Sequence, residues 1–403
     1  MTEHQATEQQ ATEHQATEHQ AASTPDAGET AVPWSGGEGR ERAGRRPGPG
    51  GSSGIDAHGG RRRGRGGRGG GRGEKAIVPD ADFRSYYGRQ ILKSPVWHHD
   101  IPAYLFLGGV AAGSSLLGAG GDLTDRPALR RTGRVASLAG IGASLGFLVN
   151  DLGRPSRLLN MLRVAKPTSP MSMGTWILTV YGPGAGVAAV AEALPLLRRR
   201  SGVVGRTARG PLGRLLGGAA RPAGLSAAAL APLVASYTAV LLSDTAVPTW
   251  HDAHPQLPFV FCGSAAAASG GLALVAAPLA QTPPARALAV GGAVVELAVA
   301  HRMERAMGLS GEPLHLGHAG RLSAWSRRLT VAGALLAVAG RRSRPLSVLA
   351  GAALLGGSAC TRFAVFEAGV ASTKDPKYVV VPQRARVERG EAVRHPGRAP
   401  RAS

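Results

Sequence analysis

The sequence IPAYLFLGGVAAGSSLLGAGG, residues 101–121, runs for 21 residues without a charged side chain. The hydrocarbon core of a bilayer is about 30 Å thick, and about 20 residues of α-helix are needed to cross it. Glycine and alanine are abundant in the stretch, as expected where helices pack closely in lipid. Only 4% of the chain is aromatic, which is low for a large aqueous core. The stretch therefore predicts a transmembrane helix.

Similar runs recur along the chain up to residue 361. Most lack charged residues, but one contains Glu296 and another contains Arg327 and Arg328, whose long side chains can reach an interface. We predict an all-α integral membrane protein with a bundle of eight transmembrane helices; the alternative for the two charged runs is a pair of soluble surface helices. The seven further runs are residues 135–150, 167–191, 222–243, 255–285, 287–303, 324–340 and 345–361.

Glycine pairs spaced four residues apart support close packing of helices in lipid. Such pairs occur at Gly109 and Gly113, at residues 142 and 146, and at residues 182 and 186. Because the spacing is common in glycine-rich sequence, it supports a packed bundle without identifying one.

Ionisable residues gather at alternate ends of the predicted helices. Consecutive helices of such a bundle run in opposite directions, so these ends lie on one face, which also carries both tails. Ionisable groups at membrane depth are costly, so a one-sided cluster indicates a site for a ligand or a proton relay, with decoration of helix ends as the alternative. The residues concerned are His98, His99, Asp100, Asp151, Asp244, Glu296, His301, Arg362 and Glu367.

Two members of this cluster, Glu296 and Arg362, lie deepest, and we expect them to pair because an unpaired buried charge is costly. Loops on the opposite face hold 15 Lys and Arg against 9 on the loops of the cluster's face. The positive-inside rule then places the opposite face in the cytoplasm.

Several classes of redox or nucleotide site are excluded by residue type. The only two cysteines, Cys262 and Cys360, cannot supply four ligands to an iron–sulfur cluster or zinc ion. No histidine lies in the middle of a predicted span, so no haem is expected. No phosphate-binding loop is present.

An apolar bundle with a polar pocket at one face remains, which suits an amphipathic molecule such as a quinone. It also suits the competing interpretation, a secondary transporter or channel without redox partners.

Charge and hydropathy divide the chain into three parts: a tail of residues 1–80, a membrane domain of residues 81–370 and an extramembrane tail of residues 371–403. The first part contains TEHQA repeats and an Arg/Gly-rich segment, and its composition predicts disorder. The arginines suggest binding to RNA or an anionic surface, but no aromatic residues interleave with them, and nucleic acid is not expected as a partner. Residues 375–382 are expected to form an extended contact for a partner.

Short motifs, in order, resemble one family. They are residues 86–97 (YYGRQILKSPVW), residues 101–109 (IPAYLFLGG), residues 151–157 (DLGRPSR), residues 166–172 (KPTSPMS), Tyr237, and residues 248–250 (PTW). Over about residues 83–385 the chain is similar to the NrfD/PsrC family, the integral membrane subunit of polysulfide-reductase-like molybdoenzyme complexes of anaerobic respiration.

The resemblance implies an eight-helix anchor in the plasma membrane that is not catalytic alone. It would exchange electrons between menaquinone or ubiquinone and a ferredoxin-like four-cluster iron–sulfur subunit, which would serve a molybdopterin catalytic subunit. Such a chain needs no haem, iron–sulfur cluster or metal of its own.

The resemblance also implies site residues. In the family an Asn and a His on the first span and a Tyr on the fourth hold the quinone. The corresponding positions here are Ile101, Tyr104 and Tyr237, so one contact is kept, one is replaced by another polar residue and one is lost. His99 or Asp100 can stand in for the lost group.

We further predict a proton relay or pocket from Asp151, Asp244, Glu296, His301 and Arg362, and partner docking by Arg154, Arg157 and Trp250.

Overall fold

The computed structural model describes residues 90–154 and 156–389. The predictions for the tail of residues 1–80 and for residues 390–403 lie outside the described residues. Within the described residues the chain forms α-helices and short 3-10 turns, without a strand. The predicted all-α class is therefore confirmed for this part of the chain.

Eight of the described helices are 20 residues or longer, and they coincide with the eight predicted runs. Proline is the first or second residue of six of them, where its missing N–H has no helical partner to lose. The eight are α2 (Asp100–Leu123), α3 (Pro127–Asp151), α5 (Pro170–Leu197), α7 (Pro211–Ser243), α9 (Leu257–Ala276), α10 (Pro283–Met307), α11 (Gly317–Ala339) and α12 (Arg344–Lys374).

Seven of these helices are long and apolar enough to cross a membrane, and α11 is the exception. It spans 23 residues but carries Arg321, Arg327 and Arg328 in its first half. It packs along α12, so it belongs to the bundle whether or not it crosses the bilayer by itself. The structure thus supports seven spans within the described residues, and the eighth stays a prediction.

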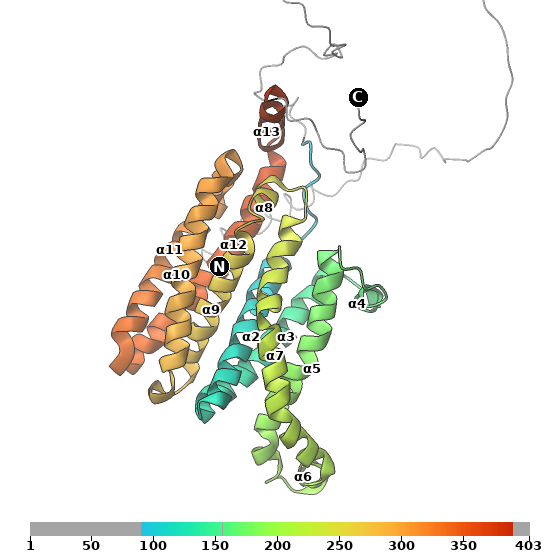
Figure 1. Ribbon diagram of the computed structural model, residues 1–403, viewed down its shortest axis with the longest axis vertical. Coiled ribbons are helices and arrows are strands. Elements are labelled where there is room, and N and C mark those ends of the chain that lie inside the picture. The colour runs from blue at the N-terminus through green and yellow to red at the C-terminus, as the bar shows by residue number, and fades with distance from the viewer. Residues whose placement is uncertain (1–89, 155, 390–403) are drawn as a thin grey trace, which may run out of the picture. The chain divides into compact units, whose positions relative to one another are not determined.

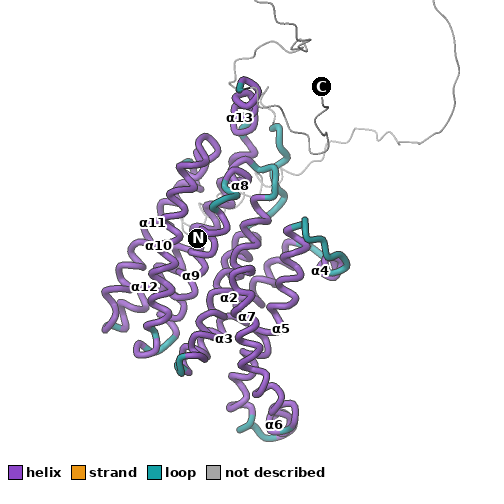
Figure 2. The backbone as a smooth tube through the Cα atoms, in the orientation of Figure 1, coloured by secondary structure: helices purple, strands orange, loops and turns teal. Residues whose placement is uncertain are grey.

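The long helices lie side by side, and short connections join them at alternate ends (Figures 1 and 2). One end of the bundle carries α4 (Ser156–Met161), α8 (Pro248–Asp252) and α13 (Lys377–Glu388), and we call it the site face. The other end carries α6 (Gly202–Arg209), and we call it the basic face. Consecutive long helices therefore run in opposite directions, as the clustering of ionisable residues requires.

Helix α2 lies at the centre of the bundle, where it contacts α3, α7, α9 and α12. Gly109 and Gly113 lie against Ala265 and Ser269 of α9, and a Cβ at Gly113 would overlap the Ser269 side chain. The prediction of close packing is thus confirmed for this glycine pair. It is wrong for the pairs at residues 142 and 146 and at residues 182 and 186, because a Cβ there would meet no atom within 4 Å.

Residues 375–382 are not extended, contrary to expectation. Most of them belong to helix α13, which begins at Lys377. Lys377 forms an ion pair of 2.9 Å with Glu312, and the Tyr378 hydroxyl donates to the same carboxylate at 3.3 Å. The hydrogen bond to Glu312 raises the pKa of the Lys377 ammonium above its usual value. These two contacts fasten the helix to the site face.

Candidate functional site

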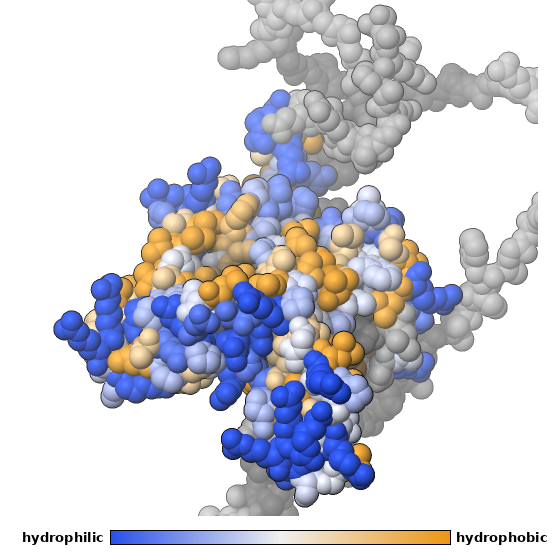
Figure 3. Space-filling model, turned by 60° about the horizontal axis from the view of Figure 1, so that its bottom comes forward, coloured by the Kyte–Doolittle hydropathy of each residue, from blue (hydrophilic) through white to orange (hydrophobic). Residues whose placement is uncertain are grey.

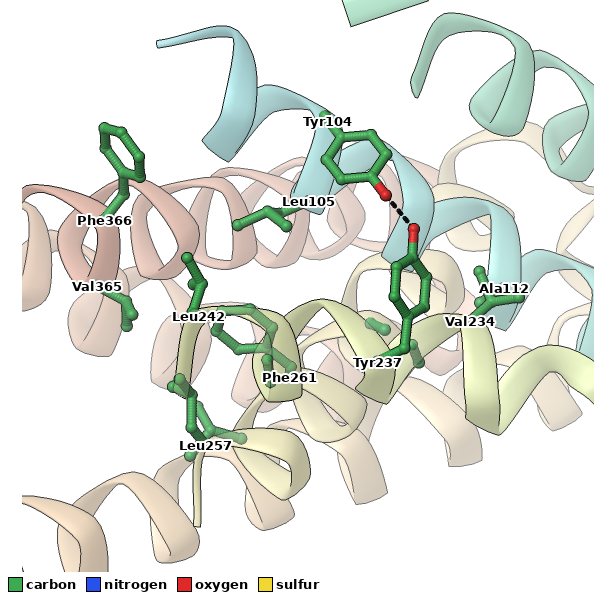
Figure 4. Close-up of a cluster of buried hydrophobic side chains, with 14 of the residues drawn as sticks. Tyr104, Leu105, Ala112, Val234, Tyr237, Leu242, Leu257, Phe261, Val365 and Phe366 are labelled. Atoms are coloured by element: carbon green, nitrogen blue, oxygen red, sulfur yellow. Dashed lines mark hydrogen bonds between the residues drawn. The ribbon is translucent and has the colours of Figure 1, made fainter. Parts of the chain in front are cut away.

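Two tyrosines meet inside the bundle near the site face. Tyr104 lies one turn into α2 and Tyr237 lies in the last two turns of α7, and their hydroxyl groups are hydrogen-bonded to each other (Figure 4). Only 4% of Tyr104 and 8% of Tyr237 are exposed. The family resemblance assigned both residues to one quinone site, and the structure joins their hydroxyl groups.

The two tyrosines line a pocket between α2, α3, α5 and α7, which we call the tyrosine pocket. It encloses about 690 Å³ of empty space, a figure that includes its open mouth. Most of its wall is apolar, with Ile101, Leu148 and Leu178 among the lining residues. Asp151, at the end of α3, contributes the one carboxyl group among the lining residues. The pocket is therefore amphipathic, with its polar groups near the site face.

A glycine on α5 makes room for one of the phenol rings. The Tyr237 ring lies so close to Gly174 that a Cβ there would be 2.5 Å from two ring carbons. Gly174 also lines the tyrosine pocket. The sequence analysis missed this residue, because the contact joins two helices and no local pattern marks it.

His99 and Asp100 lie beside the tyrosine pocket but do not line it. The His99 ring nitrogen Nε2 is 3.1 Å from Glu367 on α12, and 75% of the His99 side chain is exposed. The Asp100 carboxylate accepts a hydrogen bond of 2.6 Å from the Asn150 amide on α3. Both side chains thus hold the start of α2 to its neighbours, and the partner of Asp100, Asn150, directly precedes Asp151 in the chain.

Glu296 and Arg362 are buried in the other half of the bundle, 3% and 1% exposed. Thr361 donates a hydrogen bond of 2.5 Å to Glu296, which lines a separate hollow with about 450 Å³ of empty space, including its mouth. The Arg362 guanidinium lies 3.6 Å from the centre of the Phe261 ring and donates to the Phe261 carbonyl at 2.8 Å. No ion pair joins the two residues, which differs from the expected pairing, and Glu296 Oε2 has no hydrogen-bond partner among the described residues.

A family model described as "Polysulphide reductase, NrfD" matches residues 90–299. The chain belongs to the NrfD family. No curated protein matches the sequence. The matched region contains both tyrosines, Asp151 and Glu296, whereas Arg362 lies beyond it. Together with the seven apolar helices in the described part of the chain, membership makes this NrfD protein a multi-pass membrane protein of the kind that serves oxidoreductase complexes as their membrane subunit.

The remaining predicted residues of this NrfD protein are dispersed. Asp244 and His301 are exposed near the ends of α7 and α10 and do not line the tyrosine pocket. Arg154 is exposed in the turn after α3, while the side chain of Arg157 in α4 lies outside the described part of the chain. Among the described residues no group of three or more His, Cys, Asp or Glu is placed to hold a metal ion.

Trp250, the third predicted docking residue, is a core residue in this NrfD protein. It is 0% exposed, and its indole N–H donates a hydrogen bond of 2.7 Å to the carbonyl of Val365. Its ring stacks on Trp97 with centroids 5.8 Å apart and lies 5.7 Å from Phe366. It therefore offers a partner no surface.

Near the basic face, a buried charge network of this NrfD protein joins α2, α3 and α5. Arg134 forms ion pairs of 2.9 Å with both Asp122 and Glu192, and Arg130 lies 2.8 Å from Glu192. The side chains of Arg134 and Glu192 are only 7% and 6% exposed. The spacing of Arg130 and Arg134, four residues apart, puts both side chains on one face of α3.

Proposed function

We propose that this NrfD protein is the quinone-reactive membrane subunit of an oxidoreductase complex in the plasma membrane. It exchanges electrons between menaquinone or ubiquinone and a partner iron–sulfur protein with four clusters, which in turn serves a molybdopterin catalytic subunit. The observation that carries the proposal is the hydrogen-bonded pair of Tyr104 and Tyr237 on the wall of an apolar pocket.

The residues of the tyrosine pocket fit the chemistry of a quinone. A bound quinone supplies carbonyl oxygens that take up electrons and protons. Of the two phenol hydroxyls, one donates its proton to the other, so the acceptor of that bond keeps a proton that it can donate to a ligand. An O–H directed into an apolar site stabilises charge on a ligand oxygen more than it would in water. The apolar wall formed by residues such as Leu148 and Leu178 suits the tail.

Protons would reach the pocket from the site face. Asp151 lines the pocket at the end of α3, next in the chain to Asn150, which is hydrogen-bonded to Asp100. A carboxyl group in this position can hold a proton and pass it to the phenols. His99, paired with Glu367 and largely exposed, would exchange protons with water.

A second proton-holding group is proposed in the other half of the bundle. The carboxyl group of Glu296 has one oxygen bonded to Thr361 and one without a partner, and it lines a cavity that also contains Ser326 and Glu304. Arg362 would add positive charge near Glu296, and His301 and Asp244 would relay protons at the surface. Arg154 and Arg157 are proposed to dock the partner at the site face.

The test uses the complex purified with its partner subunits. Tyr104→Phe together with Tyr237→Phe removes both hydroxyls and keeps the rings, so turnover of a water-soluble quinone analogue is expected to fall by about tenfold or more. Tyr181→Phe is the matched control, because this buried hydroxyl bonds to Ser137 and Ala111 away from the pocket. Unchanged turnover in the double variant would overturn the site assignment.

The partner proteins distinguish the proposed function from the alternative, a transporter or channel. Co-purification of an iron–sulfur protein and a molybdopterin enzyme with the tagged chain is the expected result. A chain that purifies without them, and that drives solute flux in proteoliposomes, would replace the proposed function.

A further inference from the structure

A hollow lined by two arginines lies at the basic face, between α10 and α11. It encloses about 850 Å³ of empty space, including its mouth, and we call it the arginine pocket. Its charged lining residues are Arg286, at the start of α10, and Arg341, in the turn after α11. None of its lining residues lines the tyrosine pocket, so it is a separate site.

Arg286 is held in place although it has no acidic partner. It is 8% exposed, and its guanidinium donates to the carbonyl of Ala337 on α11 and lies 3.4 Å from the Thr282 hydroxyl. Those acceptors use two of the five N–H donors of a guanidinium, so others stay available. Within the described chain neither Arg286 nor Arg341 forms an ion pair, and no acid lines the pocket. Two like charges on one cavity wall favour an anion between them.

One helical turn further into the bundle than the arginines, the wall is apolar. Val290 follows Arg286 by one turn of α10, and Val338 precedes Arg341 by about one turn on α11. Beyond them, exposed apolar side chains continue along both helices, with Val294 58% and Leu335 66% exposed. The pocket thus changes from cationic at the helix ends to apolar one turn further in.

This order matches one class of ligand. A phospholipid in a bilayer presents its phosphate at the level of the helix ends and its acyl chains further in. Figure 3 shows hydrophilic residues gathered on the ends of the helices that face the viewer, with apolar surface beside them. The excess of basic residues on this side is the pattern of a cytoplasmic face, where anionic lipids concentrate.

We propose that the arginine pocket binds the headgroup phosphate of an anionic phospholipid, with Arg286 and Arg341 as its ligands and an acyl chain along Val290 and Val338. The same two arginines would attract inorganic phosphate, but only a lipid uses the apolar half of the wall. The occupied pocket would fasten the start of α10 to the end of α11.

The experiment measures lipid retention on the full-length protein by native mass spectrometry, with phosphatidylglycerol and phosphatidylcholine supplied in turn at equal concentration. Wild type is expected to retain phosphatidylglycerol more tightly than phosphatidylcholine. Arg341→Gln is expected to lower that affinity about fivefold, the effect of one arginine near an anionic headgroup. Arg342→Gln is the matched control, because Arg342 neighbours Arg341 and is exposed but does not line the pocket.

Two further variants keep the result interpretable. Arg286→Gln should lower the affinity for phosphatidylglycerol as Arg341→Gln does. If the Arg286 variant fails to fold, the variant of the exposed Arg341 alone tests the proposal. Val338→Trp narrows the apolar half without changing charge, and it should weaken phosphatidylglycerol binding while leaving binding of inorganic phosphate unchanged. Equal losses in the Arg341 and Arg342 variants, or displacement of the lipid by millimolar phosphate, would overturn the proposal.

Discussion

The hydroxyl of Tyr104 on α2 is hydrogen-bonded to the hydroxyl of Tyr237 on α7, 133 positions further along the chain. The bond joins two helices across the wall of the tyrosine pocket, where both residues are buried. A polar group buried in this way is costly to leave without a partner. The pair therefore stabilises the fold as well as supplying the polar end of the pocket.

The two hydroxyls are expected to be energetically coupled. Either Tyr104→Phe or Tyr237→Phe should lower the free energy of unfolding by about 1 kcal/mol, because each leaves the other hydroxyl unpaired. The double variant leaves nothing unpaired, so its loss should be smaller than the sum of the two single losses. Denaturation in detergent of the four forms measures this coupling. Strictly additive losses would mean that the bond contributes nothing.

Gly174→Ala is expected to displace the Tyr237 ring. The new Cβ would lie 2.5 Å from two ring carbons, so the ring or the helix must shift. Such overpacking costs about 1–3 kcal/mol, and it should also weaken binding of a quinone analogue because Gly174 lines the pocket.

Gly186→Ala on the same helix is the matched control for Gly174→Ala. Its Cβ would meet no atom within 4 Å, so stability should stay equal or rise by up to about 1 kcal/mol through helix propensity. Both variants are compared by thermal unfolding and by ligand affinity. Equal behaviour of the two would contradict the contact between Gly174 and Tyr237.

The positions of the long helices were predictable because a bilayer demands long uncharged runs of nearly fixed length. Their ends were not, because charges do not stop a membrane helix. Helix α7 begins at Pro211, well before the predicted residue 222, since Arg214 and Arg221 lie within its exposed first turns. Helix α12 continues past Thr361 to Lys374 with Arg362 buried inside it.

The site was predictable only in part. Tyr104 and Tyr237 were found through a family resemblance, and Asp151 through its place at a helix end. Their common pocket depends on how α2, α3, α5 and α7 cross, which no local pattern encodes. For the same reason the sequence analysis missed Gly174 and assigned Trp250 to the surface. An aromatic residue in a short loop looks identical in sequence whether it faces a partner or the core.

The stability of the fold should depend on Glu192, the acid shared by the arginines of the buried charge network near the basic face. Glu192→Gln removes the charge that Arg134 and Arg130 approach at 2.9 and 2.8 Å. Because Arg134 is buried and would keep only Asp122 as an ionic partner, unfolding stability should fall by about 3 kcal/mol. Arg131→Gln is the control, since this side chain is 65% exposed and 3.8 Å from Glu192, and its loss should be close to zero. Similar unfolding temperatures for both variants would argue against a structural role for the network.

Trp250→Phe separates a core role from a docking role. The indole N–H bonds to Val365, and Gly369 on α12 lies so close to the ring that a Cβ there would overlap it. Phenylalanine keeps the aromatic character but removes the side-chain donor to the Val365 carbonyl and opens a gap beside Gly369, so we expect a loss of about 2–3 kcal/mol.

Partner affinity distinguishes the two roles. When measured well below the unfolding temperature, affinity of the Trp250→Phe variant for the iron–sulfur subunit should equal that of wild type, because the indole has no exposed surface. Arg154→Gln provides the opposite case: the residue is exposed at the site face, so docking should weaken while thermal stability stays unchanged. A Trp250 variant that unfolds like wild type but binds its partner less tightly would show that Trp250 takes part in docking. In that case α8 would have to open when the partner binds.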